Sequence, residues 1–157
     1  MEMINGHIFK DMLASGANNL SNKFTEIDAL NVFPVPDGDT GTNMSLTFNA
    51  GVKDALACSS EDVCDIAKVL SKGLLMGARG NSGVITSQIF RGLYQGMDGM
   101  KEVNGFQLAN ALVMGSRVAY KAVMRPVEGT ILTVVREAAD YTYAYATSIE
   151  DVTCLQV

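Results

Sequence analysis

Two aspartates, Asp37 and Asp39, flank a single glycine in the stretch NVFPVPDGDTGTNM, residues 31–44. Two prolines in the preceding apolar run fix φ and end helical structure, so the pair lies on a constrained, irregular backbone. From such a backbone both carboxylates can point at one centre. Carboxylate oxygens are hard ligands that suit Mg²⁺ or Ca²⁺, which makes this loop a candidate cation site.

The residues around the pair narrow the choice of cation. An EF-hand is excluded, because Gly41 stands at its fifth position and Phe48 at its twelfth, where a Glu is required. Mg²⁺ usually takes one or two carboxylates and completes its shell with water and phosphate oxygens. The following Thr40, Thr42 and Asn43 fit such an anion, since small residues at a helix start let backbone amides approach it. The alternative is a plain Asx-type turn, but the attached TGTN favours the metal–phosphate interpretation.

A second candidate loop is GARGNSG, residues 77–83, whose three glycines recur at every third position. Either of its first two glycines can be a helix C-cap, which is the interpretation favoured for the loop taken alone. The alternative is a set of free amides from Asn81 to Val84 at a helix N-terminus, with the Ser82 hydroxyl added. Arg79 can hold a phosphate or face solvent. The loop is neither a P-loop nor a dinucleotide fingerprint, because no GK[ST] follows and no strand precedes it.

A third candidate loop is MRPVEGT, residues 124–130. Pro126 and Gly129 force a turn, and Thr130 can cap the helix that follows. Taken alone, the stretch is interpreted as a turn. Arg125 and Thr130 could serve a bound nucleotide only if this loop lies beside the first two.

Helical periodicity dominates the elements that must position these loops, and no region shows sustained strand alternation. One helix face, for example, carries Val63, Ile66, Ala67, Leu70 and Leu74. Ser59 or Ser60, Asn104 and Thr130 are predicted N-caps. The sequence predicts an all-α chain of about seven to eight helices joined by short loops. The expected helices cover residues 5–22, 24–30, 42–57, 61–76, 82–95, 104–124 and 130–146, with a short further one beginning near 149.

The last helix is predicted from Ser148 and Asp151, which resemble a capping box with Asp in place of Glu or Gln. Its apolar Val152, Leu155 and Val157 need a partner. Either the segment docks back on the bundle, or the chain is a fragment of a longer protein, and the fragment is favoured.

The composition bounds the classes of function. The chain has 157 residues, 48% apolar and 18% charged, which fits one globular domain. A net charge of -5 without a basic run argues against nucleic acid but not against an anionic small molecule. The three cysteines show no metal-ligand spacing, and the lone His7 has no catalytic partner in the pattern. Without a signal peptide or an apolar run of ~18 residues, a cytoplasmic protein with no membrane insertion is expected.

Taken together, the three stretches NVFPVPDGDTGTNM, GLLMGARGNSGVITSQIFRG and AVMRPVEGTILTV resemble the nucleotide-binding domain of the dihydroxyacetone kinase group. The most specific likeness is to the N-terminal domain of bacterial fatty acid kinases, which work with a separate fatty-acid-binding protein. The resemblance covers essentially the whole chain, and the motifs occur in the family's order and spacing.

The resemblance implies a barrel of antiparallel helices that binds ATP or ADP across loops at one end, with two Mg²⁺ ions bridging the phosphates. The partner would present a fatty acid carboxylate to the γ-phosphate, and the acyl phosphate product would feed phospholipid synthesis. The full-length protein could form a homodimer. The carried-over metal ligands are Asp37, Asp39 and Asn31. The carried-over nucleotide contacts are Thr40, Gly41, Thr42, Asn43, Gly80, Asn81, Ser82, Gly83, Arg125, Thr130 and Ile131.

Two departures from the family pattern stand out. Sugar kinases of the group have a third aspartate before the pair, whose nearest counterpart is Asn31, a carbonyl ligand without charge. The family's domain also continues through another helix and a glycine-rich loop, so residues 1–157 are expected to be a single ATP-binding kinase domain that is incomplete at its C-terminus. Such a fragment would bind nucleotide weakly and not turn over alone.

Two other functions stay open. One is the nucleotide subunit of a dihydroxyacetone-type kinase, against which Asn31 and DGDTGTN in place of the sugar-kinase D-x-D-H-G pattern count. The other is a non-catalytic helical interaction module in which the three loops are only turns.

Overall fold

The computed structural model describes residues 2–157, and these residues form six helices and one two-stranded sheet. The sheet pairs β1 (Met3–Ile4) antiparallel with β2 (Val103–Asn104). The all-α prediction is therefore confirmed, although strands of two residues are too short to show alternation in the sequence. The helices are α1 (Gly6–Leu30), α2 (Thr40–Ala57), α3 (Val63–Met76), α4 (Gly80–Gly96), α5 (Gly105–Ala122) and α6 (Ile131–Ser148).

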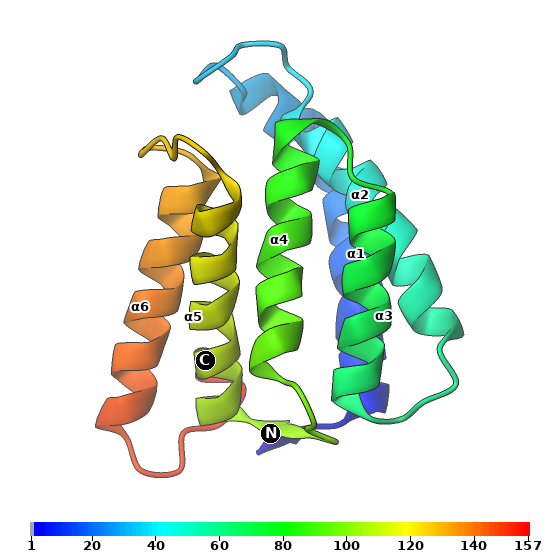
Figure 1. The fold of residues 1–157 in the computed structure, drawn as a ribbon, viewed down its shortest axis with the longest axis vertical. Helices are drawn as coiled ribbons and strands as arrows, with labels where there is room; N and C mark the ends of the chain where they lie inside the picture. Colours follow the sequence, from blue (N-terminus) through cyan, green and yellow to red (C-terminus); the bar gives the residue numbers. More distant parts are fainter. Residues whose placement is uncertain (1) are drawn as a thin grey trace.

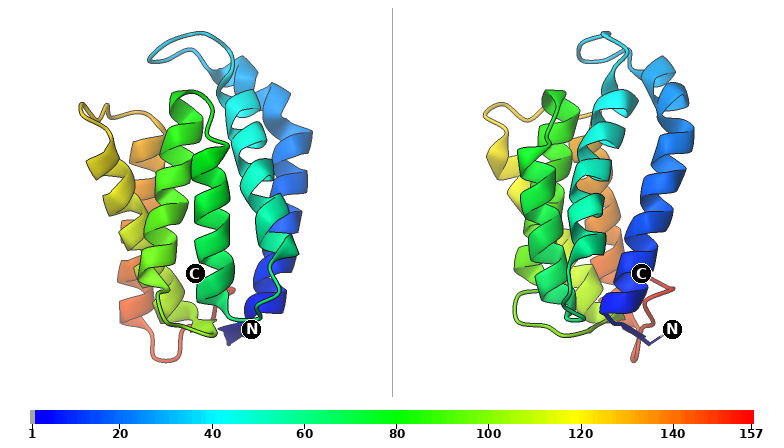
Figure 2. Two further views of the ribbon diagram at one scale, coloured as in Figure 1. Left: turned by 45° about the vertical axis from the view of Figure 1, so that its right-hand side comes forward. Right: turned by 90° about the vertical axis from the view of Figure 1, so that its right-hand side faces the viewer.

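The helices run up and down beside one another (Figures 1 and 2). Each packs against the next in sequence, and α2 also packs against α4. In such an arrangement every second connection reaches the same end. The α1–α2, α3–α4 and α5–α6 connections, which are the three candidate loops, therefore all lie at the top of Figure 1, and the small sheet lies at the bottom.

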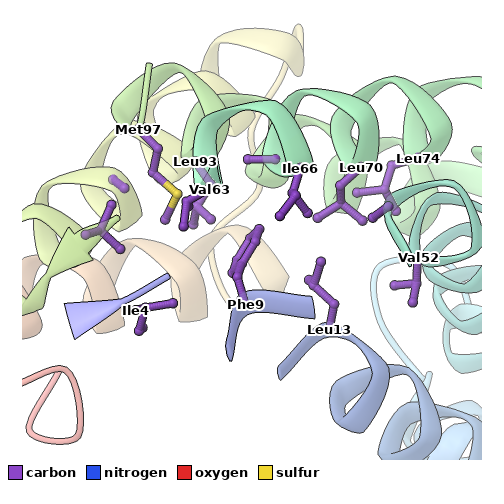
Figure 3. Close-up of a cluster of buried hydrophobic side chains, with 14 of the residues drawn as sticks. Ile4, Phe9, Leu13, Val52, Val63, Ile66, Leu70, Leu74, Leu93 and Met97 are labelled. Carbon is purple, nitrogen blue, oxygen red and sulfur yellow. The ribbon is translucent and has the colours of Figure 1, made fainter. Parts of the chain in front are cut away.

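One apolar core joins the first four helices (Figure 3). It contains Phe9 and Leu13 of α1, Ile66 and Leu70 of α3, and Leu93 of α4. Ile66 and Leu70 are at most 1% exposed. The face predicted for α3 is thus the buried one, and it fixes α3 between its neighbours.

The predicted helix count of seven to eight is too high, since the described residues hold six. The first two predicted helices form one continuous helix, α1, because no glycine or proline occurs near residue 23 to break it. Lys23 instead bonds Glu26 one turn later, at 2.8 Å between Nζ and Oε1. This continuous helix carries the chain directly to the first candidate loop.

The helix predicted near Ile149 is also wrong. Ser148 Oγ donates backwards to the Tyr145 carbonyl at 2.7 Å, and Asp151 has φ 57, which ends helical geometry. The segment after α6 turns and packs back on the bundle, where Cys154 is buried and its Sγ lies 3.4 Å from the carbonyl oxygen of Glu2.

The predicted caps are confirmed at two of three helices. Asn104 and Gln107 form a capping box at α5, and the Thr130 side chain caps α6. At α3 the N-cap position is Asp62, whose side chain makes no cap bond within residues 2–157, and Ser60 Oγ donates to the Asp65 carboxylate at 2.8 Å instead of capping the helix. Within the described part of the chain, no helix is both long enough and apolar enough to span a membrane.

Candidate functional site

The α1–α2 loop is closed by its first residue. Asn31 Nδ2 donates to the Val35 carbonyl at 2.9 Å, and Asn31 Oδ1 accepts from the Asp39 amide at 3.2 Å. The Asn31 side chain therefore bridges the part of the loop that contains both prolines, and it fixes the position of the segment from Asp37 to Asp39. Its Oδ1 keeps one free lone pair, which is what a carbonyl ligand to a metal would use.

An aspartate that the sequence analysis did not single out joins the loop to the helix behind it. Asp28 Oδ1 accepts from the Thr42 amide at 2.9 Å, and Oδ2 accepts from Thr42 Oγ1 at 2.6 Å. Hydrogen bonds from the Thr42 hydroxyl, then from its amide, hold the pKa of Asp28 below its ordinary value. Asp28 thus caps α2 from the end of α1. A spacing of 14 residues leaves no local pattern by which sequence reasoning could find the pair.

The capping by Asp28 determines what the first loop offers a ligand. Asp39 occupies the N-cap position of α2, but no cap bond from its side chain is found in the described residues. Its carboxylate is therefore available. Gly41 is buried against α1, where an added Cβ would lie 2.2 Å from the Phe24 carbonyl oxygen. Gly41 and Thr42 consequently face α1.

The α3–α4 loop is held by α2. The Arg79 amide donates to Oγ1 of the fully buried Thr47 at 3.0 Å. Gly77 is the C-cap of α3, as the plainer interpretation of this loop predicts. Helix α4 begins two residues earlier than predicted, and the Gly83 amide already bonds the Arg79 carbonyl at 3.0 Å. The amides that lack a helical partner are therefore those of residues 80–82, whereas the prediction placed them at residues 81–84.

The first two loops contact each other directly. Ser82 Oγ donates to the Thr40 carbonyl at 3.3 Å. Gly80 has φ +59, and an added Cβ would lie 2.4 Å from Asn43 Nδ2, so the Asn43 side chain lies against bare glycine backbone. The N-termini of α2 and α4 are thereby brought side by side.

The third loop completes the group. Thr130 Oγ1 donates to the Val127 carbonyl at 2.7 Å and accepts from the Leu132 amide at 3.3 Å, which sets the start of α6. Because α2, α4 and α6 all begin at this end of the bundle, three helix N-termini with their partial positive charge lie near one another (Figure 2).

One pocket of about 600 Å³ lies among the three loops. Its lining includes eleven of the fourteen residues singled out from the sequence: Asn31, Asp37, Asp39, Thr40, Asn43, Gly80, Asn81, Ser82, Arg125, Thr130 and Ile131. Three do not line it: Gly41, Thr42 and Gly83, each of which packs or bonds toward a neighbouring helix. The exposed Arg79 is also outside the lining. The condition set for the third loop, that it lie beside the other two, is met.

The pocket also has an apolar wall that sequence reasoning did not find. It is formed by Val84 and Ile85 of α4, Ala122 and Val123 at the end of α5, and Leu132 of α6. These residues follow the ordinary helical pattern, so their sequence carries no signal of a ligand site. The pocket thus has polar residues at the starts of α2 and α4, and its apolar wall runs from the second turn of α4 to the end of α5 and the start of α6.

The pocket wall offers few protein ligands to a cation. In residues 2–157, no three His, Cys, Asp or Glu side chains gather closely enough to hold a metal ion by themselves. Asp37 and Asp39 supply two carboxylates at the pocket wall. That set fits Mg²⁺ shared with a phosphate, which requires only one or two protein carboxylates, and it does not fit a closed structural site.

The fold and the pocket define an all-α domain that has a ligand pocket at one end of its helix bundle, formed by three interhelical loops. The chain belongs to the DAK2 domain family, whose match covers residues 34–155. This is the kinase family of the dihydroxyacetone kinases, so the broader resemblance drawn from the sequence motifs is confirmed.

Curated relatives are similar in sequence to this chain over nearly its whole length. An uncharacterized protein of Staphylococcus epidermidis is 52% identical over 154 residues, which is 98% of this chain. Protein YloV of Bacillus subtilis is 51% identical over 152 residues, which is 97% of this chain. An uncharacterized protein of Staphylococcus aureus is 51% identical over 154 residues. The chain spans 28% of the length of each of these relatives.

Proposed function

We propose that the pocket binds ATP or ADP with Mg²⁺, and that the chain is the nucleotide domain of a fatty acid kinase. In this proposal a separate fatty-acid-binding protein presents the acceptor, and phosphoryl transfer to the carboxylate gives an acyl phosphate. The observation that carries the proposal is the convergence of all three motif loops on one pocket. Membership of a kinase family supports the reaction class.

The two ends of the pocket suit the two ends of a nucleotide. A volume of about 600 Å³ is in the range of small-molecule sites. The starts of α2 and α4, with Asn43, Asn81 and Ser82, offer donors and helix dipoles to phosphates. The apolar wall formed by α4, α5 and α6 offers contact to a base.

The metal would be held by the first loop. Asp37 and Asp39 would supply carboxylate oxygens, and Asn31 Oδ1 is the third candidate ligand. Mg²⁺, of which two ions are expected, supplies the positive charge that neutralises the transferring phosphoryl group. This chain's own residues orient the nucleotide: Thr40 and Asn43 border the carboxylates, and Arg125 brings a positive charge from the third loop.

A carboxylate acceptor is favoured over a sugar hydroxyl because the pocket lining contains no histidine. The chain has a single histidine, His7, which is exposed at the start of α1 and lies 3.2 Å from Asp11. The sugar-kinase pattern has histidine where this chain has Thr40. A fatty carboxylate is already ionised near neutral pH, so its phosphorylation requires no proton acceptor.

Thermal unfolding with and without Mg²⁺·ADP tests the binding step. A ligand of the folded state raises the midpoint by mass action, and Asp39→Asn should abolish the Mg²⁺-dependent part of the rise. Asp98→Asn is the matched control, because Asp98, like Asp39, is an exposed aspartate next to a glycine but lies outside the pocket. Equal shifts for wild type and Asp39→Asn would instead favour the interaction module.

ATP consumption with alternative acceptors, measured on a protein of the relatives' full length, tests the transfer step. A fatty acid held by its binding protein should support ATP consumption, and hydroxylamine should trap the acyl phosphate as a hydroxamate. Dihydroxyacetone should not support it. The opposite preference would assign the pocket to a dihydroxyacetone-type kinase.

A further inference from the structure

The third loop, residues 124–130, has little to hold it in shape except side chains. Its residues 124–129 are all exposed, and in the described chain no backbone–backbone hydrogen bond joins them to any other segment. Pro126 has no amide hydrogen to donate, and Gly129 has φ +80. Nevertheless this loop supplies Arg125, Val127 and Thr130 to the pocket lining. Something other than burial must therefore fix its geometry.

The carboxylate of Glu128 collects donors from both helices that the loop connects. Tyr120 Oη of α5 donates to Oε1 at 3.0 Å. Thr133 Oγ1 and Arg136 Nη2, both of α6, donate to Oε2 at 2.8 and 2.9 Å. The Arg136 Nε donates in turn to Tyr120 Oη at 3.2 Å, which closes the ring.

The same cluster reaches the loop backbone. Thr133 Oγ1, which donates to Glu128, also accepts from the Gly129 amide at 2.8 Å. The hydrogen bonds from Thr133 and Tyr120 lower the pKa of Glu128, so the carboxylate is ionised near neutral pH. An isolated exposed ion pair contributes little to stability, but three donors that share one carboxylate restrict each other's geometry.

Glu128 does not itself line the pocket, whereas Val127 before it and Thr130 two residues after it do. We propose that Glu128 is a positioning residue, whose bonds to Tyr120, Thr133 and Arg136 hold the third loop in the shape that presents Arg125 and Thr130 to the nucleotide. The inference rests on the proposed nucleotide site and adds a residue that is neither among the carried-over nucleotide contacts nor in the pocket lining. Its energetic effect falls on binding more than on folding, because the cluster is exposed.

Two variants with a matched control test the proposal by calorimetric titration of Mg²⁺·ADP. Glu128→Ala should weaken binding by about tenfold, the loss typical when a supporting hydrogen-bond partner is removed. Glu128→Gln keeps the size and one acceptor oxygen, so it should restore part of the affinity. Glu137→Ala should leave the affinity unchanged, although Glu137 also lies 3.7 Å from Arg136. A merely structural role would lower the unfolding midpoint without this order of affinities.

Hydrogen exchange of the Gly129 amide provides a readout that needs no nucleotide. Glu128→Ala should accelerate it while the amides in the middle of α5 and α6 exchange as before. Unchanged Gly129 exchange together with unchanged Mg²⁺·ADP affinity would overturn the positioning role and leave the nucleotide site standing. A wild-type chain that binds no Mg²⁺·ADP would overturn the proposed function, which is a visibly different result. If Glu128→Ala fails to fold, Tyr120→Phe breaks the same ring and should give the same direction of change.

Discussion

Replacing Gly80 by alanine strains the contact between Gly80 and Asn43, where the first two loops meet. Gly80 has φ +59, a left-handed conformation that alanine adopts at a cost of about 1 kcal/mol. The added Cβ would also lie 2.4 Å from Asn43 Nδ2 and 3.0 Å from its Cγ. Because the contact is with the end of a side chain, Asn43 must leave its rotamer, which costs about 1 kcal/mol more.

These two costs predict a measurable difference in unfolding midpoint between alanine variants of two glycines. Gly80→Ala should lose about 2 kcal/mol, a fall in the unfolding midpoint of about 4–8 °C for a domain of this size. Gly99→Ala is the matched control, because Gly99 has φ +74 and nothing within 4 Å of the added Cβ. It should lose only the backbone term, about 2–4 °C.

Thermal unfolding followed by circular dichroism measures both variants, and a titration of Mg²⁺·ADP completes the test. In Gly80→Ala the displaced Asn43 would disturb the pocket wall, so the nucleotide-induced rise should shrink. In Gly99→Ala that rise should equal the wild-type value. If the two variants unfold at the same temperature and respond equally to nucleotide, the contact between Gly80 and Asn43 has no role at the site and the reasoning fails.

Three further changes have defined outcomes. Thr47→Val should lower the urea-measured free energy of unfolding by about 1–3 kcal/mol, because the Arg79 amide loses its acceptor, and Thr47→Ser should lose less. Asp28→Asn should unfold at a lower temperature than wild type near neutral pH, and the gap should close below about pH 4. The sign follows from the lowered pKa of Asp28, whose bonds to Thr42 stabilise the fold only while the carboxylate is ionised; a gap that stays constant with pH would contradict this. Leu70→Ala, in the core and 1% exposed, should lose about 2–5 kcal/mol in the same urea experiment.

The sequence predicted local features of the fold well. The buried face of α3 and the caps Asn104 and Thr130 depend on residues within one or two turns of each other, and the structure confirms them. The false break before residue 24 arose because a change in apolar spacing is a weaker signal than a proline or glycine, and none is present there. Ser148 and Asp151 match a capping box in spacing, but Ser148 bonds backwards to Tyr145 instead.

The features that sequence reasoning missed depend on how separate helices are placed. Asp28 and Thr42 are 14 residues apart on two helices. Glu128 bonds residues five and eight positions away across a turn, a spacing that no helix or strand period marks. The motif loops could be found from their unusual composition. That the α2 amides of Gly41 and Thr42 face α1, and that α5 adds Ala122 and Val123 to an apolar wall, follows only from how the helices pack.

The small sheet has a consequence for the order of folding. Met3 pairs with Asn104, and Cys154 returns to the backbone of Glu2, so this end of the bundle is closed by contacts that span almost the whole chain. Contacts of that separation carry the largest loop-closure entropy and form late. At the opposite end each candidate loop joins two consecutive helices, which can dock as a hairpin. We therefore expect the three helix hairpins and their loops to form early, and the end that holds the sheet to close last.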